Sequence, residues 1–284
     1  LVGIVVLAAG ILIAGGGWEN IMGTIRTNHP QMLEPLSGGT MPVSLYFTQW
    51  LLVGIFTFAL PQSVVRCMGY KDTKSLRGAM IGGTITIGAM MIGVTTLGVL
   101  SAGVLTGDLA SYGGSVDNII PRTIVETLPP WLAGVAIVGP VAASISTVSS
   151  LLIASSSAII KDLWLHYADD RGQQVSDAVV ARSSQIITLG VGVIVFVLAV
   201  VPPSVIWKIN MFAFGGLETA FCWVLVGALF FKRANKVGAI ASMVGGTAVY
   251  CLCMALGFKL FGLHQIVIGI TVSLLCMAIG SWIG

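Results

Sequence analysis

Residues 179–201, with the sequence VVARSSQIITLGVGVIVFVLAVV, decide the fold of this chain more clearly than any other stretch. Arg182 is the only charged residue in it. Hydrocarbon offers the backbone no hydrogen-bonding partner, so a spanning segment must be a helix that satisfies itself or a strand of a closed barrel. Barrel strands alternate over about ten residues, whereas a helix needs roughly 20 apolar residues to cross a bilayer. The stretch therefore predicts a membrane-spanning helix.

The rest of the chain has the same apolar character. Of its 284 residues, 56% are hydrophobic and 9% are charged, and the mean hydropathy is +0.98. Soluble domains are about a quarter charged, so a chain this apolar needs lipid as the solvent for much of its surface. The net charge of +3 gives no bulk attraction to nucleic acid. We therefore predict an all-α, polytopic membrane helix bundle whose partner is the lipid bilayer, with no nucleic-acid partner.

Apolar runs separated by polar loops predict eight spans along the chain. The chain begins with Leu1 inside an apolar run and closes in another, so we expect it to be a fragment of a longer protein. The predicted spans are 1–17, 44–66, 76–105, 131–160, 179–201, 204–231, 238–258 and 264–284.

Lysine and arginine residues predict how these spans are oriented, because cytoplasmic loops collect positive charge. Ten of the 14 fall in alternate loops, so those loops are expected to be cytoplasmic, with residue 1 near the cytoplasm and the loop 18–42 outside. The ten are Arg66, Lys71, Lys74, Arg77, Lys161, Arg171, Arg182, Lys232, Arg233 and Lys236. The opposite side keeps Arg26, Arg122, Lys208 and Lys259.

A proline interrupts the second predicted span, in the stretch GIFTFALPQ at residues 54–62. Pro61 has no backbone N–H, so it leaves the carbonyl of Thr57 without its helical partner and predicts a broken helix. Transporters turn the free backbone groups at such breaks toward their substrate. A simple packing kink is the alternative. Phe56 and Phe58 could likewise gate a cavity or merely pack.

The fourth predicted span is rich in hydroxyl side chains, from Pro140 to Ser157. Small and hydroxyl residues recur there at spacings of three and four, so they form one stripe that faces the bundle. Hydroxyl and carbonyl oxygens suit a hard monovalent cation such as sodium. Tight helix packing, with hydroxyls bonded back to the preceding turn, explains the same pattern. The stripe consists of Ala143, Ser146, Thr147, Ser150, Ala154 and Ser157.

Glu218 is the only acidic residue that lies well inside a predicted span, in the segment AFGGLET at residues 213–219. A carboxyl within a membrane is costly and is by default a functional candidate. The alternative is a structural role, with the carboxyl buried and hydrogen-bonded to helix neighbours.

Motifs of soluble enzymes are missing from the sequence. It has no GxxxxGK[ST] phosphate loop, no HExxH pair and no GxSxG elbow. His29, His166 and His264 do not have the spacing that a metal needs, and the five cysteines include no CxxC pair. We expect neither an enzyme nor an organic cofactor.

Several segments, taken together, resemble the sodium/solute symporter family. Residues 60–74, LPQSVVRCMGYKDTK, are followed by AASIST at 142–147 and KDLW at 161–164. The segments AFGGLE at 213–218 and FGLH at 261–264 narrow the likeness to pantothenate carriers of that family. The resemblance runs over essentially the whole chain in order.

The resemblance implies a leucine-transporter-like fold, which contains two inverted repeats of five helices. On this mapping residues 1–17 end core helix five, residues 18–231 form the second inverted repeat with core helices six to ten, and residues 232–284 add C-terminal transmembrane helices. The broken span becomes core helix six, which lines the substrate site. The hydroxyl-rich span becomes core helix eight. Core helix one, which carries further sodium ligands, is absent from this chain.

The same mapping assigns roles to individual residues and to partners. It implies sodium-coupled symport of a small organic anion by alternating access, with pantothenate as the expected substrate and sodium as the coupling ion. The partner would be the N-terminal half of the same protein. The sodium ligands fall on Ala143, Ser146 and Thr147, and the substrate-binding or gating residues are expected to be Phe56, Phe58, Gln62 and Glu218.

Two other functions remain compatible with the same scaffold. One is symport of another solute, such as proline or a short monocarboxylate. The other is a membrane sensor that keeps the fold without transporting. In each case the expected location is the bacterial inner (cytoplasmic) membrane, crossed several times.

Overall fold

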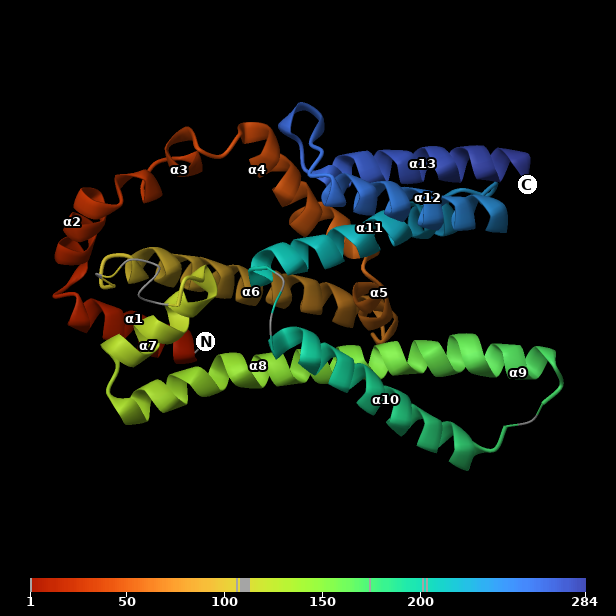
Figure 1. Ribbon diagram of the computed structural model, residues 1–284, viewed down its shortest axis with the longest axis horizontal. Coiled ribbons are helices and arrows are strands. Elements are labelled where there is room, and N and C mark those ends of the chain that lie inside the picture. The colour runs from red at the N-terminus through yellow and green to blue at the C-terminus, as the bar shows by residue number, and fades with distance from the viewer. Residues whose placement is uncertain (1, 106, 108–112, 174, 201, 203) are drawn as a thin grey trace. The chain divides into compact units, whose positions relative to one another are not determined.

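A computed structural model describes residues 2–105, 107, 113–173, 175–200, 202 and 204–284. The regular structure in these residues is helical throughout and includes no strand (Figure 1). Six helices within them are long and apolar enough to cross a membrane. This confirms the predicted class, an all-α bundle of membrane helices.

The six long helices coincide with six of the predicted spans. The longest is continuous over Pro130–Asp170 and consists of α8 (Pro130–Ser157), a π-helical segment (Ala158–Leu165) and α9 (His166–Asp170). The others are α6 (Thr73–Ser101), α10 (Asp177–Val200), α11 (Ile206–Phe230), α12 (Lys236–Ala255) and α13 (Gln265–Ile283).

The remaining two predicted spans are not single long helices. The first is α1 (Val2–Ala14), which is followed by α2 (Trp18–Asn28) at an angle of 78°. Gly16 and Gly17 separate them with positive φ angles of 72° and 98°, a backbone region that glycine enters without strain. The second is a shorter apolar stretch, Val43–Ala59, which the break before Pro61 ends. The interruption of the second span is the one that Pro61 predicted, whereas the bend that follows α1 was not predicted.

Short helical segments complete the chain. They are α3 (Leu36–Gly39), α4 (Val43–Trp50), α5 (Pro61–Met68) and α7 (Ile119–Thr127), with 3-10 turns at Pro30–Met32, Val116–Asn118 and Leu260–Gly262. The contacts divide the chain into two compact units. The first contains Leu1–Trp18 and Val104–Val205, and the second contains Glu19–Gly103 and Ile206–Gly284.

In the first unit, α1 packs on α7 and α8, and α8 packs on α10. Gly10 of α1 lets this helix lie directly against Leu128 at the end of α7. The contacts between α8 and α10 bury little: α10 buries none of its residues, and α8 buries only Ala133, Ala136 and Ser156. Most of the surface of these two helices is therefore open within this unit.

In the second unit, α11, α12 and α13 lie side by side (Figure 1). Small residues allow the close approach: a Cβ added at Gly280 would lie 2.7 Å from the Cα of Gly238. A Cβ added at Gly246 would lie 3.0 Å from the Cα of Ser273. In this bundle, glycines therefore allow tight helix packing.

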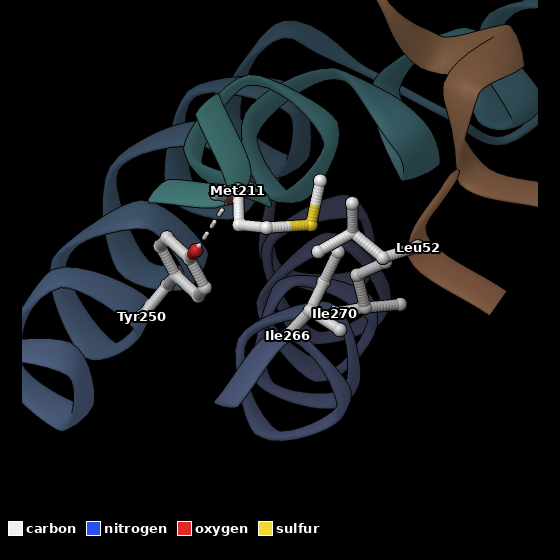
Figure 2. Packing of buried hydrophobic residues seen from close by; sticks show 5 residues of the cluster. All are labelled: Leu52, Met211, Tyr250, Ile266 and Ile270. Atoms are coloured by element: carbon white, nitrogen blue, oxygen red, sulfur yellow. Dashed lines mark hydrogen bonds between the residues drawn. The ribbon is translucent and has the colours of Figure 1, made fainter. Parts of the chain in front are cut away.

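A hydrophobic cluster joins this bundle to the broken segment (Figure 2). Its buried members are Leu52, Met211, Tyr250, Ile266 and Ile270. Within it the Tyr250 hydroxyl donates to the carbonyl of Met211 at 3.2 Å. Since Leu52 precedes the break and the other four belong to α11, α12 and α13, the cluster fixes the break against the bundle.

Candidate functional site

The break in the second predicted span has a defined backbone path. After α4 the chain forms a π-helical turn (Leu51–Ile55) and a 3-10 turn (Phe56–Ala59), and Leu60 is extended, with φ −67° and ψ 127°. Helix α5 then begins at Pro61, where a missing N–H costs nothing. The prediction of a broken helix around Pro61 is confirmed.

The backbone hydrogen bonds at the break differ from those that the sequence predicted. The carbonyl of Thr57 is not free, because the N–H of Leu60 donates to it at 3.2 Å. The Thr57 hydroxyl donates to the carbonyl of Val53 at 2.5 Å and reaches that of Leu52 at 3.3 Å. The expectation of a free Thr57 carbonyl is therefore wrong. In the 3-10 turn this carbonyl accepts from the N–H of Leu60, three residues later, in place of the N–H that Pro61 lacks.

Glu218 lies on α11, which packs against the 3-10 turn of the break. Its side chain is fully buried, and Thr57 is the polar side chain of the break that lies against it. The Thr57 hydroxyl itself donates to the backbone carbonyls of its own turn. Neither carboxyl oxygen of Glu218 has a hydrogen-bond partner among the described residues. A buried group left without a partner carries its full desolvation cost, so Glu218 is an unsatisfied site next to the break.

The other three residues expected at the substrate site also belong to the second unit. Phe56 packs against the hydrophobic cluster, which agrees with the alternative that it packs rather than gates. Phe58 is 43% exposed, and Gln62 is partly buried in the first turn of α5. The structure thus gathers Phe56, Phe58, Gln62 and Glu218 around the break and α11.

The three residues expected to bind sodium share one turn of α8 in the first unit. The hydroxyls of Ser146 and Thr147 both donate to the carbonyl of Ala143, each at 3.0 Å. This is the back-bonded arrangement that packing alone would explain. It also places three oxygens side by side, and each hydroxyl keeps its lone pairs for a cation. The helix continues through Pro140, one turn earlier.

A polar seam between α11, α12 and α13 was not expected from the sequence. The hydroxyls of Ser242 and Ser273 lie 2.8 Å apart, and Ser273 donates to the carbonyl of Thr219 at 2.9 Å. The Trp223 indole donates to the carbonyl of Ile270 at 2.9 Å. In sequence, Ser242, Gly246 and Tyr250 recur every fourth residue, which is the signal that could have pointed to this face.

No group of three or more His, Cys, Asp or Glu side chains within the described ranges could hold a metal ion. The Ala143 turn presents neutral oxygens, from one carbonyl and two hydroxyls. Sodium tolerates such neutral ligands better than a divalent transition metal does.

Sequence comparisons agree with the membrane character of both units. Residues 1–246 match the profile described as the Sodium:solute symporter family. A sodium/pantothenate symporter of Haemophilus influenzae is 34% identical over 283 residues, which cover 99% of this chain and 57% of the relative. One of Escherichia coli is 36% identical over 285 residues, or 100% and 58%.

A more distant relative carries a different name. The osmoregulated proline transporter OpuE of Bacillus subtilis is 26% identical over 289 residues, which cover 99% of this chain and 57% of the relative. The chain thus spans less than two thirds of the length of all three relatives.

Proposed function

Because this chain belongs to the sodium:solute symporter family, we propose that it forms the C-terminal portion of a symporter that couples sodium entry to uptake of a small organic anion. Pantothenate is the favoured substrate. The observation that carries this proposal is the higher identity to the two sodium/pantothenate symporters than to the proline transporter, over the same length of chain. Proline is the second candidate, because a proline transporter also aligns over nearly the whole chain.

Sodium is proposed to bind at the α8 turn, to the carbonyl of Ala143 and the hydroxyls of Ser146 and Thr147. The 3.0 Å spacing of these oxygens supports the assignment, since one ion can touch all three after a small rotation of the side chains. Hard cations need several oxygens, so three cannot complete the shell. The rest of the full-length protein would supply the others, and core helix one is the expected source.

The substrate is proposed to bind beside the break, with Phe56, Phe58 and Gln62 lining or gating the path. Glu218 is proposed to stabilise the backbone of the break. Its carboxyl lies against Thr57, whose hydroxyl donates to the carbonyl of Val53 in the preceding π-helical turn. A carboxylate in direct contact with an anionic substrate would repel it. We therefore assign Glu218 a positioning role.

The proposed architecture is leucine-transporter-like, with residues 18–231 as the second inverted repeat, placed in the bacterial inner membrane. Transport would proceed by alternating access. If sodium raises the affinity for the substrate, the substrate raises the affinity for sodium by the same factor. The membrane potential contributes about 2.3 kcal/mol per charge per 100 mV, so an inward-negative potential favours sodium entry. The sodium gradient and this potential are the only energy inputs required.

Uptake by the full-length protein tests the proposal. Cells that lack their own pantothenate uptake would express it, and initial rates of radiolabelled pantothenate entry would be measured in sodium and in potassium medium. The proposal expects uptake that requires sodium and that unlabelled pantothenate suppresses more strongly than proline does. Stronger suppression by proline would assign the second candidate. Uptake that ignores sodium would reject coupling, and no uptake of either solute would favour a sensor.

A further inference from the structure

A cavity of about 360 Å³ opens at the end of the second unit where α11 and α13 begin and α12 ends. One wall is apolar and includes Met211 and Met254, with Trp207 at its side. The polar groups that line it are Gln49, Lys208, Lys259, His264 and Gln265. An adjoining cavity of about 700 Å³ shares Trp207, Gln49 and Met211 with it and extends along the broken segment to Val53.

His264 presents a hydrogen-bond donor to this cavity. The N–H of Ile266 donates to its Nδ1 at 3.3 Å, so the ring hydrogen lies on Nε2. Burial and the nearby charge of Lys259 both lower the pKa of His264 below its ordinary value, which keeps the ring neutral at pH 7. His264 is 6% exposed.

Gln265 adds a second buried polar group. It is 5% exposed and lines the same cavity. The imidazole of His264 and the amide of Gln265, adjacent in sequence, thus line one cavity and bring hydrogen-bond donors to it.

The charge of the cavity selects an anion. Lys208 and Lys259 are two of the four basic residues that the sequence places on the outer side, and they line the same cavity. None of its described lining residues is acidic, although Glu34 lines the adjoining cavity. The N-terminal ends of α11 and α13 add partial positive charge, which the C-terminal end of α12 offsets in part. Ammonium, amide and imidazole donors around an apolar wall suit a carboxylate on a small, partly apolar molecule.

We propose that this cavity is an entry site at the outer mouth, which binds the carboxylate of the transported anion before it reaches the break. The proposal rests on the proposed function, because the carboxylate it names is the substrate. Positive charge around a cavity raises the local concentration of an anion and the rate at which it arrives. The adjoining cavity along Trp50 and Val53 then provides the route inward.

A charge-removal experiment on the full-length protein tests the entry site. In the double variant Lys208→Gln and Lys259→Gln, the KM for pantothenate at saturating sodium should rise about five- to tenfold. The maximal rate and the half-saturating sodium concentration should not change. The increase in KM should shrink when choline chloride raises the ionic strength, because salt screens exposed charges. A variant KM equal to that of the wild type would overturn the proposal.

A matched control removes the same charge from the other end of the bundle. Lys232→Gln with Lys236→Gln, where α11 is followed by α12, should leave the KM unchanged. An equal rise in this control would also reject the entry site, since overall charge would then explain the effect. Lys208→Arg with Lys259→Arg should restore the wild-type KM. Failure of this restoration, with a lowered maximal rate, would mean that the lysines act through structure.

Binding in the absence of sodium separates this proposal from the proposed function. Purified full-length protein in zwitterionic nanodiscs would be dialysed against radiolabelled pantothenate in sodium-free buffer. Binding that the double glutamine variant loses supports the entry site, even if uptake by the wild type proved independent of sodium. Sodium-dependent uptake with equal binding by wild type and variant would reject the site and leave the proposed function standing.

Discussion

Helix α8 and the α12–α13 pair contain the same kinds of residue, small ones and hydroxyls, yet use them differently. In α8 the hydroxyls of Ser146 and Thr147 donate to a carbonyl of their own helix. In the pair, Ser242 and Ser273 meet across two helices. The α8 residues are exposed, whereas both serines of the pair are fully buried.

This difference shows that composition alone does not separate packing from binding. Ser273 donates its hydrogen to Thr219 and accepts a bond from Ser242, so its hydroxyl connects three helices. A hydroxyl that bonds to its own turn keeps lone pairs free on an open face. The α8 turn is therefore the better candidate for an ion, and the α12–α13 contact is the better candidate for stability.

The largest expected effect is on the packed pair. Gly246→Val would place side-chain atoms against the backbone of Ser273, since even a Cβ there lies 3.0 Å from its Cα. Overpacking of this kind costs about 3 kcal/mol, so thermal unfolding of the purified full-length protein should shift down by several degrees. The control is Gly83→Val in α6, where no described atom lies within 4 Å of an added Cβ. Equal shifts would contradict the packing role of Gly246.

Ser273→Ala should have the next largest effect. It removes the bond to Ser242 and the bond to the carbonyl of Thr219. Two buried bonds at about 1 kcal/mol each predict a loss of roughly 2 kcal/mol in unfolding free energy. Ser149→Ala in α8 deletes one self-bonded, exposed hydroxyl and should leave the unfolding temperature unchanged. A loss as large as that of Ser273→Ala would contradict the comparison.

Glu218 tests what an unsatisfied group does in the packed unit. Glu218→Leu should lower the uptake rate about tenfold, which corresponds to about 1.4 kcal/mol, because it removes the carboxyl that lies against Thr57. Glu218→Gln keeps the shape and the hydrogen-bonding groups and should retain transport. Comparable transport by the Leu variant would show that the carboxyl is dispensable, leaving only a packing role.

The smallest effect concerns His264, where α13 joins α4. Its pKa is lowered from 6.5, so the unfolded chain binds a proton more readily than the folded one. The contribution of His264 to the free energy of unfolding should then be fully present above pH 6.5 and be lost as the pH falls below it. Melting temperatures between pH 7.5 and 5.5 provide the measurement. In His264→Gln this part of the pH dependence should disappear, and an unaltered profile would contradict the assignment.

Local sequence patterns predicted those features that depend on neighbouring residues. Apolar runs gave the positions of the six long helices, and Pro61 gave the break. Gly16 and Gly17 could have predicted the bend after α1. The carbonyl of Thr57 was misassigned because a 3-10 turn, rather than an α-helix, precedes Pro61.

Features that depend on distant partners were not predictable in the same way. Ser273 and Thr219 are 54 residues apart, and Thr48 and His264, which share a hydrogen bond, are 216 apart. No local spacing encodes such pairs, so the polar seam and the cavity around His264 emerged only from the structure. For the α8 turn, the spacing correctly gathered three oxygens, while their role as sodium ligands stays a prediction.

Sodium dependence of uptake by Thr147→Ala tests the central claim most directly. Removing one oxygen from the turn should raise the half-saturating sodium concentration about tenfold, with little change in the maximal rate at saturating sodium, because the substrate site is untouched. Thr147→Ser keeps the oxygen and should be milder, and Ser155→Ala, off the stripe on the same helix, should match the wild type. Half-saturating concentrations that stay at the wild-type value in both Thr147→Ala and Ser146→Ala would contradict the account.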